Sequence, residues 1–240
     1  MIRNSFVFLE KIRSRKEKSI LKQVSGWNEF LRSDVKGISS QRKQYYNRKI
    51  KEAQRALINE DASYFIDKLP GKEMWRLYDY FKEDCCFLDI EVDSYGNVIL
   101  VGISNYYDTN FFVKGVNLSK ESIGRQLEKY KITVTFNGSS FDLPKLKKLG
   151  VTTHVTHIDL KPLCVNLGLK GGLKEIEKKL DLRRPSHLYG NPVDLWKSFH
   201  ASGEKEWLQL LMDYNAEDCE NLKLVMQHVY KEMCAKIYKH

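Results

Sequence analysis

The sequence predicts an α/β protein: a mixed β-sheet flanked by helices and preceded by a basic, helical N-terminal extension. Three strand-like segments follow residue 83, and helices and further strands then alternate, which is the order of an α/β sheet. Before that point the chain has helical patterns and few strand formers. We therefore predict two parts, a basic helical region at residues 1–82 and a sheet domain at residues 83–240.

The N-terminal region holds the positive excess of the chain. The net charge is +9; residues 1–55 contain 15 Lys/Arg and 5 Asp/Glu, and the other 185 residues contain 25 and 26. The first part therefore carries +10 and the rest −1. A basic segment of this kind attracts a polyanion, most often nucleic acid. The alternative is an ordinary solvated face of basic helices.

The individual elements follow from periodicity and turn signals. Helical pieces are expected at 27–31, 40–57, 64–69 and 73–81 in the N-terminal region. Apolar strands are expected at 86–92, 98–104, 110–114 and 132–136, with a short one near 157–159. Further helices are expected at 119–130, 142–149, 161–168, 172–180, 192–201 and 204–234.

Composition disfavours several classes of protein. No apolar run approaches the roughly 18 residues of a membrane span, and the opening ten residues are too short and too soon charged for a secretory signal. We expect no membrane partner and a cytoplasmic location, and homo-oligomers stay possible. The five cysteines form no CxxC pair, which disfavours a zinc site or a disulfide framework. The six histidines have no ligand-like partners in the sequence: His154, His157, His187, His200, His228 and His240.

Two acids interrupt the first apolar strand. Asp89 and Glu91 are two residues apart, so on a strand their carboxylates project from one face while Leu88 and Ile90 project from the other. Two neighbouring acids on such a strand repel each other and resist desolvation, and a bound cation resolves that conflict. Asp-x-Glu alone is a weak signal, because a second copy stands at Asp218–Glu220 on a predicted helix.

A third acid is expected at the edge of the sheet. The strand ending at Phe136 is followed by a Gly-containing turn, and Asp142 comes where the next helix begins, with Pro144 suited to its first turn. Asp142 is either a carboxylate delivered beside the first strand or a helix N-cap. Asn137 and Gly138 would let the backbone approach a substrate closely.

The last long helix supplies a tyrosine and a fourth acid. Tyr214 and Asp218 are four residues apart, so they share one face of the helix. They can therefore address one site together. The alternative is a surface acid with a half-buried tyrosine one turn earlier.

These three motifs, in this order and on these element types, resemble the DEDD (DnaQ-like) 3′→5′ exonuclease superfamily, which has a ribonuclease H-like fold. Tyr214, four residues before Asp218, is typical of its tyrosine subgroup, whereas the histidine subgroup would need His at position 213, which is Asp. The amino-acid sequence at residues 137–144, 157–160 and 173–177 is most similar to that of the YprB-like branch. The resemblance covers roughly residues 86–230. It departs from the branch at Val92 and Asp93, where small hydroxyl residues are usual.

The resemblance implies a metal-dependent 3′→5′ exonuclease that acts on single-stranded nucleic acid with a free 3′ end, with DNA expected. Two Mg²⁺ or Mn²⁺ ions, about 4 Å apart in such sites, would be held by Asp89, Glu91, Asp142 and Asp218, and Tyr214 would orient the attacking water. Asn137, Gly138, Phe141 and Lys145 are the expected substrate-binding residues; Phe141 either stacks on a base or packs in the core.

Other polar residues and other activities stay open. Asp159 is expected to support the sheet, and Lys161, Arg183 and Arg184 are either phosphate contacts or exposed cations. One alternative activity is an RNA-cleaving or structure-specific nuclease of the same fold, since a fold does not determine a substrate. The other alternative is a catalytically silent nucleic-acid-binding module.

Overall fold

The computed structural model describes residues 1–152, 156–188 and 190–238. They build a five-stranded mixed sheet with the strand order β3-β2-β1-β4-β5. The first three strands form an antiparallel meander, and β4 and β5 run parallel to β1. Their bounds are β1 Cys85–Val92, β2 Val98–Ser104, β3 Thr109–Val113, β4 Ile132–Thr135 and β5 Thr156–Asp159. The predicted α/β fold with a mixed sheet is confirmed.

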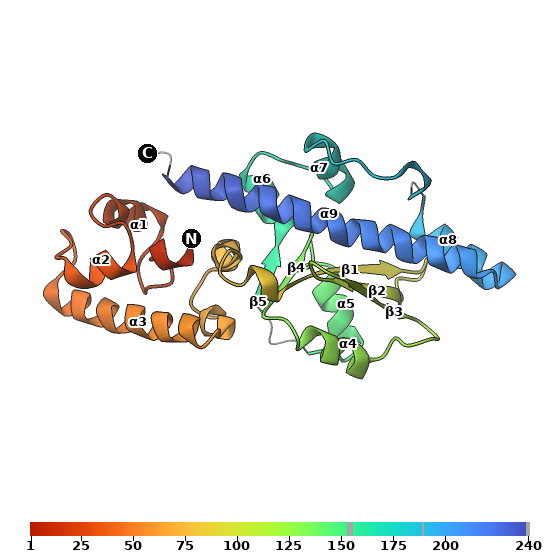
Figure 1. The fold of residues 1–240 in the computed structure, drawn as a ribbon, viewed down its shortest axis with the longest axis horizontal. Helices are drawn as coiled ribbons and strands as arrows, with labels where there is room; N and C mark the ends of the chain where they lie inside the picture. Colours follow the sequence, from red (N-terminus) through yellow and green to blue (C-terminus); the bar gives the residue numbers. More distant parts are fainter. Residues whose placement is uncertain (153–155, 189, 239–240) are drawn as a thin grey trace.

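Helices cover both faces of the sheet (Figure 1). One face packs on α4 Lys120–Leu127 and α5 Asp142–Lys148, while the long α9 Lys205–Tyr238 crosses the other. With α9 lie α6 Leu160–Asn166, α7 Leu173–Lys179 and α8 Pro192–Ser202, and a short 3-10 turn, Ser186–Leu188, precedes α8.

Alternate residues of β1 belong to the two faces. Leu88 and Ile90 pack in a cluster with Ile123 of α4, whereas Phe87 packs in the cluster that contains Leu222 of α9. The acids at positions 89 and 91 therefore face α9, as the period of two predicts.

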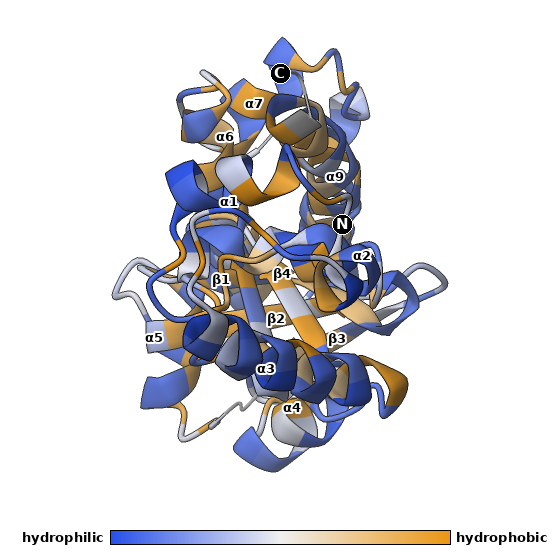
Figure 2. Cartoon of the chain, turned by 90° about the vertical axis from the view of Figure 1, so that its left-hand side faces the viewer, coloured by the Kyte–Doolittle hydropathy of each residue, from blue (hydrophilic) through white to orange (hydrophobic). Residues whose placement is uncertain are grey.

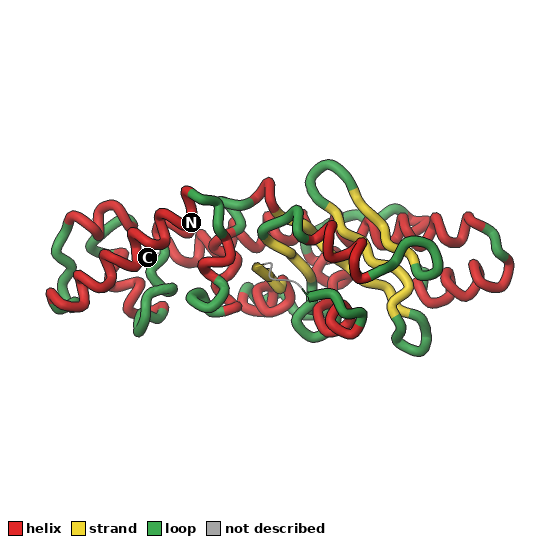
Figure 3. Tube along the Cα trace, turned by 90° about the horizontal axis from the view of Figure 1, so that it is seen from below, coloured by secondary structure: helices red, strands yellow, loops and turns green. Residues whose placement is uncertain are grey.

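The N-terminal region is helical, as expected, and lies at one end of an elongated molecule (Figure 3). It contains α1 Ser14–Leu21, α2 Trp27–Arg32 and α3 Ser40–Ile58, with 3-10 turns at Ile2–Asn4, Ala62–Phe65, Gly71–Leu77 and Lys82–Asp84. The pieces predicted at 64–69 and 73–81 are thus 3-10 turns. Segments this short rarely hold an α-helix alone, and here buried Phe65 and Trp75 fix them against the core.

A continuous apolar core joins the N-terminal region to the sheet. Phe6, Trp27 and Phe65 belong to the same cluster as Phe87 of β1 and Val229 of α9. The hydrophilic helix α3 lies at the outer side of this region (Figure 2). The division at residue 82 stays a prediction, because the packing runs across it. No described helix is long and apolar enough to cross a membrane.

Candidate active site

Strand β1 and helix α9 bring three carboxylates together. Asp89 and Glu91 stand on the α9-facing side of β1, and Asp218 points from α9 toward them. One carboxylate oxygen from each residue lies within 4.8 Å of the other two. Asp89 and Glu91 are partly exposed, whereas Asp218 is buried. An all-oxygen cluster with one open side can bind a hard divalent cation.

A glycine allows α9 to lie this close to the sheet. Gly102 of β2 pairs with Asp89, and a Cβ at position 102 would lie 1.8 Å from Oδ1 of Asn215. Asn215 is completely buried, and its Nδ2 donates a hydrogen bond of 2.7 Å to Oδ2 of Asp89. Asn215 therefore fixes the orientation of a predicted ligand. The sequence motifs did not predict this role, although Asn215 stands within Tyr-x-x-x-Asp.

Asp142 is buried at the first position of α5. The N-cap is Phe141, which makes no side-chain cap bond, so the alternative of an N-cap aspartate is wrong. Oδ1 of Asp142 is buried without a hydrogen-bond partner. Its charge raises the pKa of Asp89 and of Glu91. Asp142 therefore acts electrostatically on the cluster without belonging to the group of three within 4.8 Å, and its unsatisfied oxygen is one that a cation would satisfy.

The loop before Asp142 is held by Asp159 at the end of β5. The carboxylate of Asp159 accepts hydrogen bonds from the backbone N–H groups of Asn137 (2.8 Å) and Ser139 (3.1 Å) and caps α6. Asn137 has φ +66°, and a Cβ at Gly138 would lie 2.0 Å from Oγ1 of Thr135. The positive φ of Asn137 and the close approach of Thr135 to Gly138 thus shape the loop itself, and contact of these two residues with a substrate stays a prediction.

Tyr214 is buried, and two cations lie near its ring. The Nζ of Lys174 lies 4.5 Å and the Cζ of Arg184 lies 5.2 Å from the centroid of its ring. Burial, followed by the negative charges of Asp218 and Glu91, raises the pKa of Tyr214. Its phenol therefore stays protonated at neutral pH and is available as a hydrogen-bond donor.

Arg184 is buried, so the alternative of an exposed cation is wrong for this residue. Its Nη2 donates to Oε1 of Glu177 (2.8 Å) and to Oδ1 of Asp218, and its Nε donates to Glu177 (3.3 Å). Glu177 is also buried. One signal for this pair was present in the sequence: Glu177 is an acid on the apolar face of α7, beside Ile176 and Leu180. Arg183, the neighbouring cation, is exposed.

The electrostatics of the site favour a bound cation. Burial and the charges of Asp218 and Glu91 raise the pKa of Asp89 well above its usual range. Burial likewise raises the pKa of Glu91 to about 8, that of Asp142 to about 7 and that of Asp218 to about 6. Carboxylates in this state release protons reluctantly unless positive charge is supplied. The residues present therefore fit divalent cations, whose identity the geometry leaves open.

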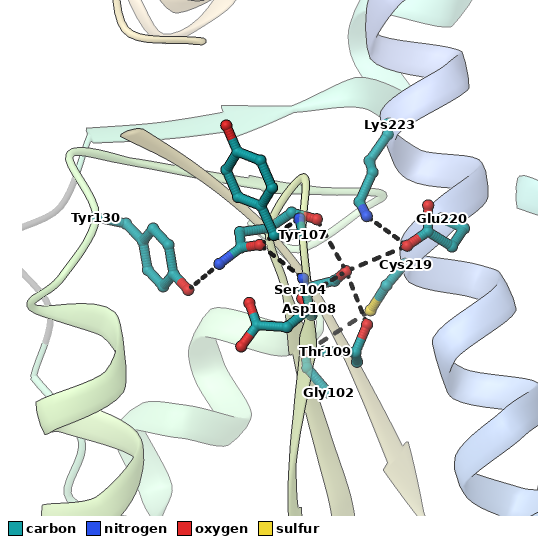
Figure 4. A network of polar contacts seen from close by, with 10 residues as sticks. Gly102, Ser104, Tyr107, Asp108, Thr109, Tyr130, Cys219, Glu220 and Lys223 are labelled. Atoms are coloured by element: carbon teal, nitrogen blue, oxygen red, sulfur yellow. Dashed lines mark hydrogen bonds and ion pairs between the residues drawn. The ribbon is translucent and has the colours of Figure 1, made fainter. Parts of the chain in front are cut away.

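The two acids of the second Asp-x-Glu motif have different surroundings on α9. Asp218 joins the acidic cluster, whereas the exposed Glu220 pairs with Lys223 and accepts a hydrogen bond of 3.5 Å from Ser104. Figure 4 shows this network, in which Cys219 and Glu220 of α9 lie against β2 at Gly102 and Ser104. Glu220 thus helps to seat α9 on the sheet and takes no part in the cluster.

The remaining predicted residues lie around the site or outside it. Lys145 donates a hydrogen bond to the carbonyl of Gly96, with its Nζ 5.7 Å from the ring centroid of the half-buried Phe141. His157 bonds to Thr135 at 2.9 Å, which is a structural role. His154 and His240 lie outside the described residues. All five cysteines are free thiols, and four of them are buried.

Sequence comparison places the chain in a family. A model of the RNase H superfamily matches residues 86–230, which includes the whole acidic cluster. The chain therefore belongs to this superfamily, and the matched domain, with its acidic cluster, indicates a nuclease acting on nucleic acid. A comparison with curated proteins found no match.

Proposed function

We propose that the protein is a metal-dependent 3′→5′ exonuclease of the DEDD superfamily, in its tyrosine subgroup and YprB-like branch. Its proposed substrate is single-stranded nucleic acid with a free 3′ end, with DNA expected. The observation that carries the proposal is the convergence of Asp89, Glu91 and Asp218 within 4.8 Å, beside the buried Tyr214. The buried, unpartnered oxygen of Asp142 supports a further contact with a cation.

The side chains have distinct proposed tasks. Asp89, Glu91, Asp142 and Asp218 would hold two Mg²⁺ or Mn²⁺ ions, which supply charge for the reacting phosphate and acidify a bound water. Asn215 keeps Oδ2 of Asp89 in one orientation through its 2.7 Å hydrogen bond. Tyr214 donates a hydrogen bond that orients the attacking water, because its raised pKa makes it a poor base.

The central test compares isosteric variants of the site with a matched neighbour. Asp89→Asn and Asp218→Asn should each slow hydrolysis by roughly a thousandfold or more, because each removes a ligand charge. Tyr214→Phe should retain measurable activity, about ten- to a hundredfold below the wild type. Asp213→Asn is the control, since Asp213 is the exposed acid next to Tyr214. Full activity in Asp89→Asn would contradict the proposal.

End-labelled substrates separate this proposal from its rivals. Single-stranded DNA, RNA and duplex are incubated with Mg²⁺ or Mn²⁺, and products are resolved by length. A ladder that shortens from the 3′ end supports the exonuclease, whereas discrete internal cuts indicate a structure-specific nuclease. No metal-dependent product on any of the three substrates would indicate a silent binding module.

We propose that the N-terminal region contributes to the binding of single strands through exposed cations on helix α3. Arg48, Lys51 and Arg55 recur at helical spacing and are all exposed on α3. Replacing the three by Gln should weaken binding of single strands and lower the slope of log K against log salt by about 0.7 for each phosphate that is no longer neutralised. Replacing three exposed lysines elsewhere, Lys147, Lys197 and Lys205, is the control. An unchanged slope in the α3 variant would contradict this role.

A further inference from the structure

Arg184 has a buried nitrogen without a partner. Its side chain is 3% exposed, and Nε and Nη2 are occupied by Glu177 and Asp218. Nη1 is buried and finds no hydrogen-bond partner in the described part of the chain. An unsatisfied donor of a charged group is costly to bury, so such a group requires an explanation.

The unpartnered nitrogen lies at the acidic cluster. Nη1 shares the guanidinium carbon with Nη2, which donates to Asp218, and that carbon is 5.2 Å from the ring centroid of Tyr214. The segment that carries Arg184 is anchored on both sides, by the bond from the Leu182 N–H to the Glu177 carbonyl (2.9 Å) and by the buried Leu188. The guanidinium is therefore held in place beside the proposed ligands.

The charges around the site indicate which kind of group Nη1 would contact. The site gathers more carboxylates than cations: Asp89, Glu91, Asp142, Glu177 and Asp218 lie around Lys174 and Arg184. The cluster itself therefore repels a phosphodiester. The planar fork of an arginine matches two oxygens at once, one from a carboxylate and one from a phosphate.

We propose that Arg184 is a substrate-binding residue: when the strand enters the site, the groups that cover the buried Nη1 move aside, and Nη1 donates to a non-bridging oxygen of the phosphodiester to be cleaved. Nη2 donates to Asp218 and to Glu177 at the same time, and Nε donates to Glu177 as well, so the guanidinium is held in one orientation. This inference rests on the proposed function for the position of the scissile linkage. It adds a residue outside the acidic motifs, contributed by the segment between α7 and α8.

The test measures binding without catalysis. A 5′-labelled single-stranded DNA is titrated with the full-length protein in EDTA, and binding is followed by fluorescence anisotropy. A neutral methylphosphonate replaces one linkage at a time along the strand. In the wild type, neutralising the 3′-terminal linkage should weaken binding by about tenfold, as expected for a hydrogen bond from a charged group. In Arg184→Gln, that same replacement should change binding by less than about twofold.

Two controls separate contact with substrate from a structural role. Arg183→Gln removes the same charge from the exposed neighbour and should respond like the wild type. A purely structural Arg184 would lower affinity equally for every strand, without regard to which linkage is neutral. Should Arg184→Gln be too unstable to purify, Glu177→Gln/Arg184→Gln removes both buried charges and permits the same titration.

The outcomes distinguish this inference from the exonuclease proposal. A loss of sensitivity confined to the 3′-terminal linkage in Arg184→Gln supports the phosphate contact, even if no hydrolysis is found. A variant that responds like the wild type at every linkage overturns the contact, even if the enzyme shortens DNA from the 3′ end. A wild type insensitive at every linkage overturns it as well.

Discussion

Two buried arginines, one in each half of the molecule, pair with buried glutamates in different ways. In the N-terminal region, Nε of Arg76 donates to Glu73 (2.7 Å), Nη1 to Ser5 and Glu17 (both 3.1 Å) and Nη2 to Glu17 (2.9 Å). All three nitrogens have partners. Arg184, at the acidic cluster, leaves Nη1 without one among the described residues.

The difference distinguishes an ion pair that holds a fold from one that belongs to a site. The Arg76 network joins three separate segments of the N-terminal region through one carboxylate, Glu17, which also accepts from the Phe6 N–H. Of the four buried side-chain atoms without a partner in the described residues, three belong to Asp142, Arg184 and Asn215; the fourth is Nε1 of Trp75. Unsatisfied groups therefore concentrate where a ligand is expected.

The largest expected effect on stability comes from breaking the satisfied network. Arg76→Gln leaves Glu17 buried without its counter-ion, which should lower the free energy of unfolding by about 3–5 kcal/mol. Denaturant unfolding should give the same decrease with and without Mg²⁺, and hydrolysis per folded molecule should be unchanged. The decrease in Arg184→Gln, by contrast, should shrink when Mg²⁺ is added. If Mg²⁺ changed the decrease in the free energy of unfolding equally in both variants, the distinction between the two ion pairs would be wrong.

The pH dependence of the metal-free protein should follow from the raised pKa values at the cluster. Between the unfolded pKa near 4 and the folded values of about 6 for Asp218, 7 for Asp142 and 8 for Glu91, the folded state holds protons that the unfolded chain has released. The stability that these groups contribute should thus be complete below about pH 4 and should fall, by several kcal/mol, as pH rises to 8.

Thermal melting in EDTA from pH 5 to 8.5 measures this fall. Mg²⁺ should largely abolish it, and Glu91→Gln should make the EDTA curve shallower. A melting temperature in EDTA that is flat over this range would contradict the raised pKa values at the cluster.

A smaller effect should follow from filling the space at Gly102. Gly102→Ala places Cβ 1.8 Å from Oδ1 of Asn215, so Asn215 must move and its bond to Asp89 must break. We expect a decrease of about 1–3 kcal/mol in stability and a drop in hydrolysis on the order of ten- to a hundredfold. Gly124→Ala in α4 is the control: its Cβ would meet nothing within 4 Å, and the change should stabilise by up to about 1 kcal/mol. Full activity in Gly102→Ala would contradict the proposed role of the close approach.

Local periodicity allowed part of the site to be predicted from the sequence. Asp89 and Glu91 share a face because strands alternate, and Tyr214 and Asp218 share a face because four residues nearly complete a helical turn. The order of strands and helices likewise predicted the mixed sheet. These inferences need only residues that are close in sequence, so backbone geometry alone supports them.

Only the tertiary structure decided how these pieces meet. The bond between Asn215 and Asp89 joins residues 126 positions apart, and the space for it exists because a third element supplies Gly102. The burial of Arg184 depends on Glu177 and Asp218 on two different helices, so its own neighbours in the sequence could not decide between a phosphate contact and an exposed cation. The sequence by itself determined which carboxylates face one way, because that is a property of single elements. Which uncharged and cationic partners surround them depends on packing between elements, and that appears only when the chain is folded.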